Sequence, residues 1–181
     1  MKKSILVTGA HRSGSTWIGK VISSANGVRY VSEPFNMLGH KKYIPFKYWF
    51  QFIHSKSPVK EQQVASSYLK SFINISLRAL VRDFFKIRTF KDITFFLRDY
   101  KDRTTDRALL KDPIAFFSAE WIATNFDTDV VVSVRHPAAF IASLKVKNWE
   151  FNFNDFLHQP DLMLKLLPQY QSQVKDYAVD R

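Results

Sequence analysis

The sequence predicts an α/β fold in which a parallel sheet is covered by helices on both faces. Toward both ends of the 181-residue chain, short apolar runs alternate with segments whose apolar residues recur at helical spacing. The short runs lack polar alternation, which is typical of parallel strands that are buried on both sides. Hydrophobic residues make up 46% of the chain, enough to fill such a core.

The N-terminal part of this pattern consists of a strand, a turn, a helix and a second strand. The first strand is expected over residues 4–8, where the run SILVT ends at Gly9. The helix is expected over residues 15–25, which carry apolar side chains at helical spacing. A second short strand is expected over residues 28–32.

The pattern resumes toward the C-terminus. Strands are expected over residues 108–111 (ALLK) and 130–134 (VVVSV), and they are followed by helices over residues 115–124 and 138–146. Strands that alternate with helices form parallel sheets, and such sheets bind ligands at the carboxyl ends of their strands. We therefore expect functional residues where the strands end.

Residues 36–107 are predicted to form a basic, aromatic-rich helical insert between these flanks. They contain 15 Lys and Arg against 6 Asp and Glu, and half of the aromatic residues of the chain. Apolar residues at helical spacing predict an amphipathic helix between residues 68 and 86. Its basic stripe consists of Lys70, Arg78, Arg82 and Lys86. The stripe is either a solvated face or a surface for an acidic acceptor or an anionic membrane.

The composition excludes several classes of protein. The chain has no cysteine, which rules out disulfide scaffolds, thiolate zinc sites and a cysteine nucleophile. Charged residues interrupt every apolar run before the roughly 18 residues that a membrane span needs, so a soluble, cytoplasmic protein is expected. The net charge of +11 predicts an anionic partner. No RNA- or DNA-binding signature is recognisable, so this partner is not expected to be a specific nucleic acid.

A glycine-rich turn follows the first predicted strand. The segment GAHRSGST, residues 9–16, has the frame G-x-x-x-x-G followed by Ser-Thr and leads into a helix N-terminus. Free backbone N–H groups and the helix dipole make such a turn a phosphate cradle. A nucleotide triphosphatase would have Lys where this chain has Ser15, whereas Arg12 lies inside the loop and could clamp an anionic group there.

The segment RSGSTW resembles the 5′-phosphosulfate-binding loop of sulfotransferases that use 3′-phosphoadenosine-5′-phosphosulfate (PAPS). The resemblance is to the carbohydrate and tyrosyl-protein types in particular. It implies PAPS as the cofactor and adenosine 3′,5′-bisphosphate as the product. The nucleotide-binding residues that it implies in this loop are Arg12, Ser13, Gly14, Ser15, Thr16 and Trp17.

A second segment, VVVSVRHPAAFIAS, resembles the 3′-phosphate site of the same family. It places Arg135 at the end of the fourth predicted strand and Ser143 eight residues later. A guanidinium can pair with a phosphate through two parallel hydrogen bonds, and the serine hydroxyl can donate another. The resemblance therefore implies that Arg135 and Ser143 bind the 3′-phosphate.

Two further positions match the family pattern and suggest catalytic roles. Glu33 precedes Pro34 at the end of the second strand, which implies a general base for the acceptor hydroxyl, although a carboxylate near cations is also explained as a charge partner. Its strand is expected beside the phosphate-loop strand. Lys111 and Asp112 resemble the Lys-Asp-Pro of the family. The resemblance implies that Lys111, together with Arg12, stabilises charge on the transferred group, while Asp112 orients its neighbours.

The resemblance implies a P-loop-like three-layer fold and one sulfotransferase-like domain over residues 1–181. Family members usually carry a further glycine-rich C-terminal loop, so the domain is expected to be C-terminally incomplete. The implied reaction is in-line transfer of a sulfuryl group to a hydroxyl or amine, with an acidic acceptor among the candidates. The five histidines form no metal-binding pattern, so no metal is expected. A P-loop kinase or other nucleotide phosphotransferase, a nucleic-acid-binding protein, and a non-catalytic nucleotide- or polyanion-binding module stay open as alternatives.

Overall fold

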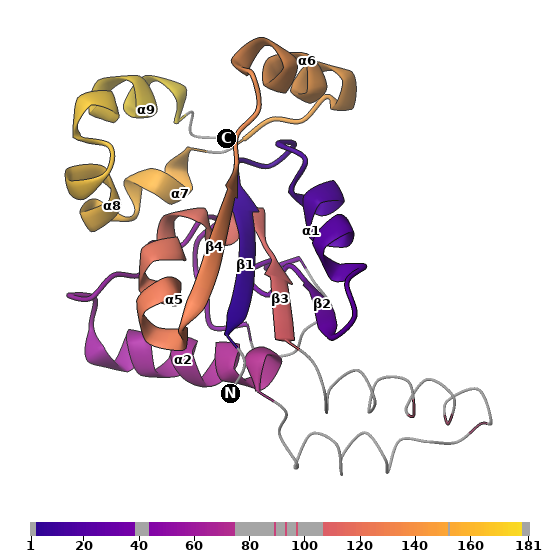
Figure 1. Cartoon of the computed structure of the whole chain (residues 1–181). Helices are drawn as coiled ribbons and strands as arrows, with labels where there is room; N and C mark the ends of the chain where they lie inside the picture. Colours follow the sequence, from indigo (N-terminus) through magenta and orange to yellow (C-terminus); the bar gives the residue numbers. More distant parts are fainter. Residues whose placement is uncertain are drawn as a thin grey trace.

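A computed structural model describes residues 3–38, 44–74, 89, 93, 97, 107–151 and 153–178. Within these residues the chain forms an α/β fold with a parallel four-stranded sheet of order β2-β3-β1-β4, flanked by helices (Figure 1). The strands are β1 (Ser4–Gly9), β2 (Val28–Ser32), β3 (Arg107–Lys111) and β4 (Thr128–Ser133). The predicted α/β class with a parallel sheet is confirmed.

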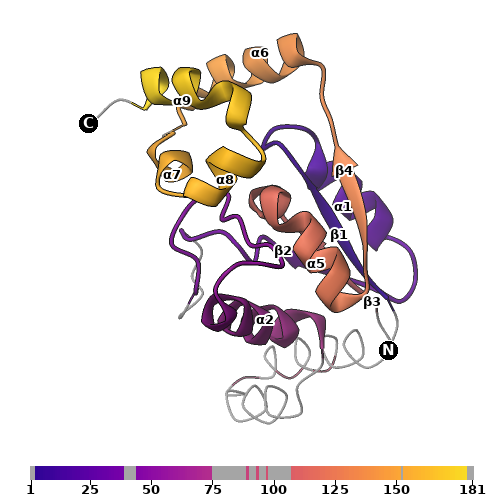
Figure 2. The ribbon, with the colours of Figure 1, turned by 90° about the vertical axis from the view of Figure 1, so that its left-hand side faces the viewer.

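Both faces of the sheet are buried, as the unbroken apolar runs predict. On one face, Leu6 and Leu110 pack with residues of α2 (Val59–Ile73) and α5 (Ala119–Phe126); in Figure 2, α5 lies in front of the sheet and α2 below it. On the other face, Val7 and Leu109 pack against α1 (Ser15–Ser23). Burying each of these leucine side chains stabilises the fold by about 1.5–3 kcal/mol.

The strand order differs from the expected one at β2. The expectation placed β2 beside the phosphate-loop strand β1, but β3 lies between them and pairs with both. Residues 108–111 of β3 are all buried, whereas β2 is only partly covered. The more apolar strand therefore occupies the centre of the sheet, and β2 forms its edge.

The expected C-terminal helices are present with changed boundaries. The helix predicted over residues 115–124 begins as a 3₁₀ segment, Pro113–Ser118, and continues as α5. Helix α6 (Pro137–Lys147) follows β4 and has no buried residue. Three short helices complete this part of the chain, namely α7 (Asn154–Leu157), α8 (Pro160–Lys165) and α9 (Gln171–Tyr177), with a 3₁₀ turn, Pro168–Tyr170, before α9.

The described part of the predicted insert belongs to the core. Phe46, Phe50, Ile53 and Leu69 are buried in the same cluster as Leu6 of the central strand. The insert is therefore not a separate layer in this region.

The predicted amphipathic helix of the insert is not continuous. Helix α2 ends at Ile73, and Asn74 after it has extended backbone angles, which stop the helix. Lys70 is exposed in its last turn. The other residues of the predicted stripe, Arg78, Arg82 and Lys86, lie outside the described residues, so the stripe stays a prediction.

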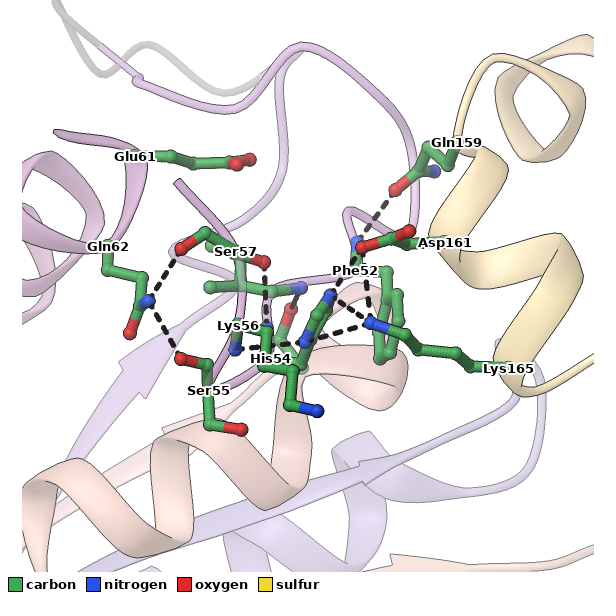
Figure 3. Close-up of polar contacts among 12 residues, drawn as sticks. Phe52, His54, Ser55, Lys56, Ser57, Glu61, Gln62, Gln159, Asp161 and Lys165 are labelled. Atoms are coloured by element: carbon green, nitrogen blue, oxygen red, sulfur yellow. Dashed lines mark hydrogen bonds and ion pairs between the residues drawn. The ribbon is translucent and has the colours of Figure 1, made fainter. Parts of the chain in front are cut away.

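A polar cluster attaches α8 to the loop that precedes α2 (Figure 3). His54 Nε2 lies 2.7 Å from Asp161 Oδ2, and Lys165 Nζ lies 3.2 Å from the same oxygen. The Phe52 N–H donates to Gln159 Oε1 over 2.7 Å. The Lys56 N–H donates to His54 Nδ1 over 3.1 Å, and Lys165 Nζ also lies 3.0 Å from His54 Nε2. These bonds hold the C-terminal helices against the core.

No helix in the described ranges has the length and apolar character of a membrane span.

Candidate functional site

The carboxyl ends of all four strands lie at one edge of the sheet, from which α6 also leaves (Figure 1). Gly9 ends β1, Lys111 ends β3, and Ser133 ends β4. Glu33 follows β2 directly, and its N–H donates to the Lys111 carbonyl over 2.8 Å. The parallel sheet thus gathers the predicted site residues at the edge where such sheets bind ligands.

The turn between β1 and α1 has the geometry of an anion cradle. Gly9 has a φ of 134°, and a side chain there would meet the Ser133 carbonyl oxygen at 2.2 Å. Gly14 is the N-cap of α1 in the left-handed conformation, and having no side chain it cannot cap the helix. The first turn of α1 also has no acidic residue. Its amide groups and positive dipole end are therefore suited to an external anion.

The two segments that resemble nucleotide-binding loops touch each other. Arg12 Nε donates to Ser143 Oγ over 3.0 Å, and Arg135 donates to the Arg12 carbonyl oxygen, also over 3.0 Å. Ser13 Oγ and Ser133 Oγ lie 2.5 Å apart, which joins the first loop to the end of β4. Arg12 has a φ of 65°, a strained conformation that often marks functional positions.

The remaining residues of the first loop differ in exposure. Ser15 is buried at the start of α1, whereas Thr16 is exposed. Trp17 is 71% exposed and leaves its indole free to stack on a planar ligand. The structure thus brings Arg12, Ser13, Arg135 and Ser143 together, and Trp17 lies at the surface in the first turn of α1.

Glu33 and Lys111 form an ion pair at the same edge of the sheet. The side chain of Lys111 is only 4% exposed, and its stem packs against Gly19 of α1. Asn36 Nδ2 donates to the other carboxylate oxygen of Glu33 over 2.8 Å. Glu33 has a φ of 44°, again in the left-handed region. Asn36 was not predicted, because nothing in its sequence position signals this contact.

Asp112 and Tyr68 hold the turn that carries Glu33. Both oxygens of the buried Asp112 carboxylate accept backbone N–H groups, from Phe35 over 2.6 Å and from Ile114 over 3.0 Å. The Tyr68 hydroxyl donates to the Pro34 carbonyl over 2.9 Å. Burial, and secondarily the charge of Asp112, raises the pKa of Tyr68 to about 12, so this donor keeps its proton. These two bonds fix the backbone at Phe35 and Ile114, and the orienting role expected for Asp112 in the reaction stays a prediction.

A cavity of about 340 Å³ opens beside Glu33. Its walls come from the loop between β1 and α1, the turn after β2, the segment before α2, the 3₁₀ segment after β3, the segment between α6 and α7, and α7. The aromatic residues in this lining are His11, Trp49, Phe50, Trp149 and Phe151. We call this cavity the aromatic pocket. The sequence did not predict it, because its walls are separated by about a hundred residues along the chain.

His11 belongs to the loop between β1 and α1 and lines the aromatic pocket. Its ring centroid lies 5.1 Å from that of Trp149 and 5.5 Å from that of Phe140. Burial among these rings lowers the pKa of His11 below its ordinary value, and the positive charge of Arg12 lowers it further. The folded protein therefore keeps this imidazole neutral at a pH where the unfolded chain protonates it.

We expect His11 to make the protein less stable in mild acid. Below about pH 6.5 the unfolded state binds a proton that the folded state resists, so the free energy of unfolding falls as the pH falls. Urea unfolding at pH 7.5 and 5.5 measures this fall. Between the two pH values, His11→Phe should lose less free energy of unfolding than the parent. His158→Phe, at an exposed position, is the matched control. An equal loss in the parent and His11→Phe would contradict this prediction.

Among the described residues, no group of three or more His, Asp or Glu side chains could hold a metal ion. No protein-family model, curated protein or solved structure matches the chain.

Proposed function

We propose that the chain is a PAPS-dependent sulfotransferase, which moves a sulfuryl group from PAPS to an acceptor hydroxyl or amine. The observation that carries this proposal is the contact of Arg12 with Ser143 and of Arg135 with Arg12, beside the uncapped N-terminus of α1. Two segments more than a hundred residues apart, each resembling one phosphate site of the same nucleotide, thus form one cationic surface. A single nucleotide with phosphates at both ends of its ribose fits this arrangement.

In this proposal the P-loop-like turn binds the 5′ end of the nucleotide. The amides of Gly14, Ser15 and Thr16 hold the 5′-phosphate, and Arg12 neutralises the 5′-phosphate together with its sulfuryl end. Arg135 and Ser143 take the 3′-phosphate. Trp17 offers its exposed indole to the purine.

The chemical step needs a base and a cation, which Glu33 and Lys111 supply. The acceptor oxygen attacks sulfur and loses its proton to Glu33, while the bond between sulfur and the 5′-phosphate oxygen breaks. Lys111 stabilises the charge that develops on that bridging oxygen. Because Lys111 contacts Glu33 in this structure, nucleotide binding must draw the ammonium toward the phosphosulfate and leave the carboxylate for the acceptor. The catalytic effect is otherwise one of positioning.

Calorimetric titration with adenosine 3′,5′-bisphosphate and adenosine 5′-monophosphate tests the proposal. The parent should bind the bisphosphate more tightly. Arg135→Ala should lose most of this preference, and Arg12→Ala should bind both nucleotides more weakly than the parent. A charge-assisted hydrogen bond contributes about 1.5–3 kcal/mol, which corresponds to roughly 10- to 150-fold in affinity.

The matched control is Lys70→Ala, which removes an exposed cation on α2 and should bind both nucleotides as the parent does. Parental affinity for the bisphosphate in both arginine variants would contradict the proposal. Tight binding of ATP with Mg²⁺, in preference to the bisphosphate, would instead favour a nucleotide phosphotransferase with the same cradle.

A further inference from the structure

The aromatic pocket is placed to hold a second molecule next to the proposed nucleotide. Glu33 lines the pocket, and His11 lies in its wall directly before Arg12 of the phosphate loop. A molecule in this cavity would therefore lie between the candidate base and the expected position of the sulfuryl group. Its volume of about 340 Å³ is at the small end of ligand pockets.

The walls of the pocket favour a flat apolar ligand. Trp49, Phe50, Trp149 and Phe151 present ring surfaces, and the neutral His11 adds a fifth ring. Phe50 and Phe151 already pack with their centroids 5.6 Å apart at 73°, an edge-to-face arrangement that an aromatic ligand can extend.

The charge of the lining is opposite to that of the chain. Among the described residues that line the pocket there is no Lys or Arg, but there are three carboxylates, Glu33, Glu150 and Asp155. Lys111 balances Glu33. Asp155 accepts the backbone N–H of Trp49 over 3.0 Å, a bond that ties this carboxylate to the segment before α2. Carboxylates beside aromatic faces attract cations and repel anions.

We propose that the aromatic pocket binds the acceptor, and that the acceptor is a small aromatic alcohol whose far end is neutral or positively charged. This inference rests on the proposed function and narrows it, because it excludes the acidic acceptors that the basic composition suggested. The hydroxyl points to Glu33, and a cationic far end lies near Asp155 and the ring faces.

Three phenols of similar size test this inference. Tyramine carries a cation, 4-ethylphenol is neutral and 4-hydroxyphenylacetate carries an anion. Each is titrated into the full chain without nucleotide, with tryptophan fluorescence and calorimetry as readouts. Tyramine and 4-ethylphenol should bind, and 4-hydroxyphenylacetate should bind at least about 10-fold more weakly than tyramine.

Variants locate the binding. Trp149→Ala should weaken the binding of tyramine and of 4-ethylphenol to a similar extent. Asp155→Asn keeps an oxygen for the Trp49 N–H but removes the charge, so the difference between tyramine and 4-hydroxyphenylacetate should shrink. Glu150→Gln, at an exposed position, provides the same test if Asp155→Asn does not fold. Glu120→Gln on α5, outside the pocket, is the matched control and should retain the parental difference.

The outcomes separate this inference from the proposed function. Binding of adenosine 3′,5′-bisphosphate without binding of any phenol would overturn the acceptor assignment alone. Tighter binding of 4-hydroxyphenylacetate than of tyramine would overturn it as well. Phenols that bind in the expected order to a chain that does not bind the bisphosphate would support the pocket and its selectivity, and would overturn the sulfotransferase proposal.

Discussion

Glu33→Gln is expected to lower turnover by about 10²–10⁴-fold, the effect of losing a general base. Glutamine keeps the shape of the side chain and can still accept from Lys111, but it cannot take a proton from the acceptor. Nucleotide affinity should stay close to that of the parent, because the proposed phosphate contacts come from other loops. The measurement is kcat with PAPS and saturating acceptor, together with calorimetric titration of adenosine 3′,5′-bisphosphate.

The control for this variant is His136→Ala. His136 caps α6 by accepting the Ala138 N–H, and it lies in the proposed 3′-phosphate segment, so its loss should appear in nucleotide binding and not in the chemical step. Near-parental turnover of Glu33→Gln at saturating acceptor would show that Glu33 is only the charge partner of Lys111. The base would then have to be sought elsewhere in the aromatic pocket.

Gly9→Ala is expected to destabilise the fold by more than about 3 kcal/mol. The backbone at Gly9 has a φ of 134°, and the new methyl group would meet the Ser133 carbonyl oxygen of the neighbouring strand at 2.2 Å. Since the methyl carbon is fixed directly to the backbone and the Ser133 oxygen belongs to the backbone of the sheet, no side-chain rotation can relieve the overlap. Equilibrium urea unfolding of parent and variant measures the loss.

Gly14→Ala separates conformational strain from steric overlap. Gly14 also has a positive φ, 94°, but no atom lies within 4 Å of the position that a methyl group would take. The cost should therefore be only that of the backbone conformation, about 1–2 kcal/mol. The assignment of the close approach at Gly9 would be wrong if the two variants lost equal stability.

Local sequence was sufficient for the elements that build the site. The run SILVT is apolar enough to be buried on both faces, and the glycines of the following loop permit the left-handed turn into α1. Most of the residues with cationic, hydroxyl and carboxylate chemistry lie next to a strand end or a helix start, whereas Ser143 lies inside α6 and was selected through the family resemblance. These features depend on neighbours within a few positions.

The errors came where long-range packing competes with local pattern. The apolar spacing after Tyr68 favoured a continuous helix, yet α2 ends at Ile73 and Asn74 is extended. The helix expected over residues 115–124 begins as a 3₁₀ segment, in which the Ser118 hydroxyl donates to the Gln51 carbonyl and accepts the Ile53 N–H. Such contacts with a distant segment cannot be read from periodicity.

The amino-acid sequence by itself determined the α/β class and the kinds of side chain at the strand ends. Both depend on apolar periodicity and on glycine conformations, which are set by patterns of a few neighbouring residues. Tertiary packing alone decided that β3 separates β2 from β1, that Arg12 reaches Ser143 across 131 positions, and that Asn36 holds the carboxylate of Glu33. It also brought Trp49 and Trp149 together around one cavity. These arrangements depend on which buried surfaces fit together best in three dimensions, and many sequences with the same local pattern could satisfy that condition differently.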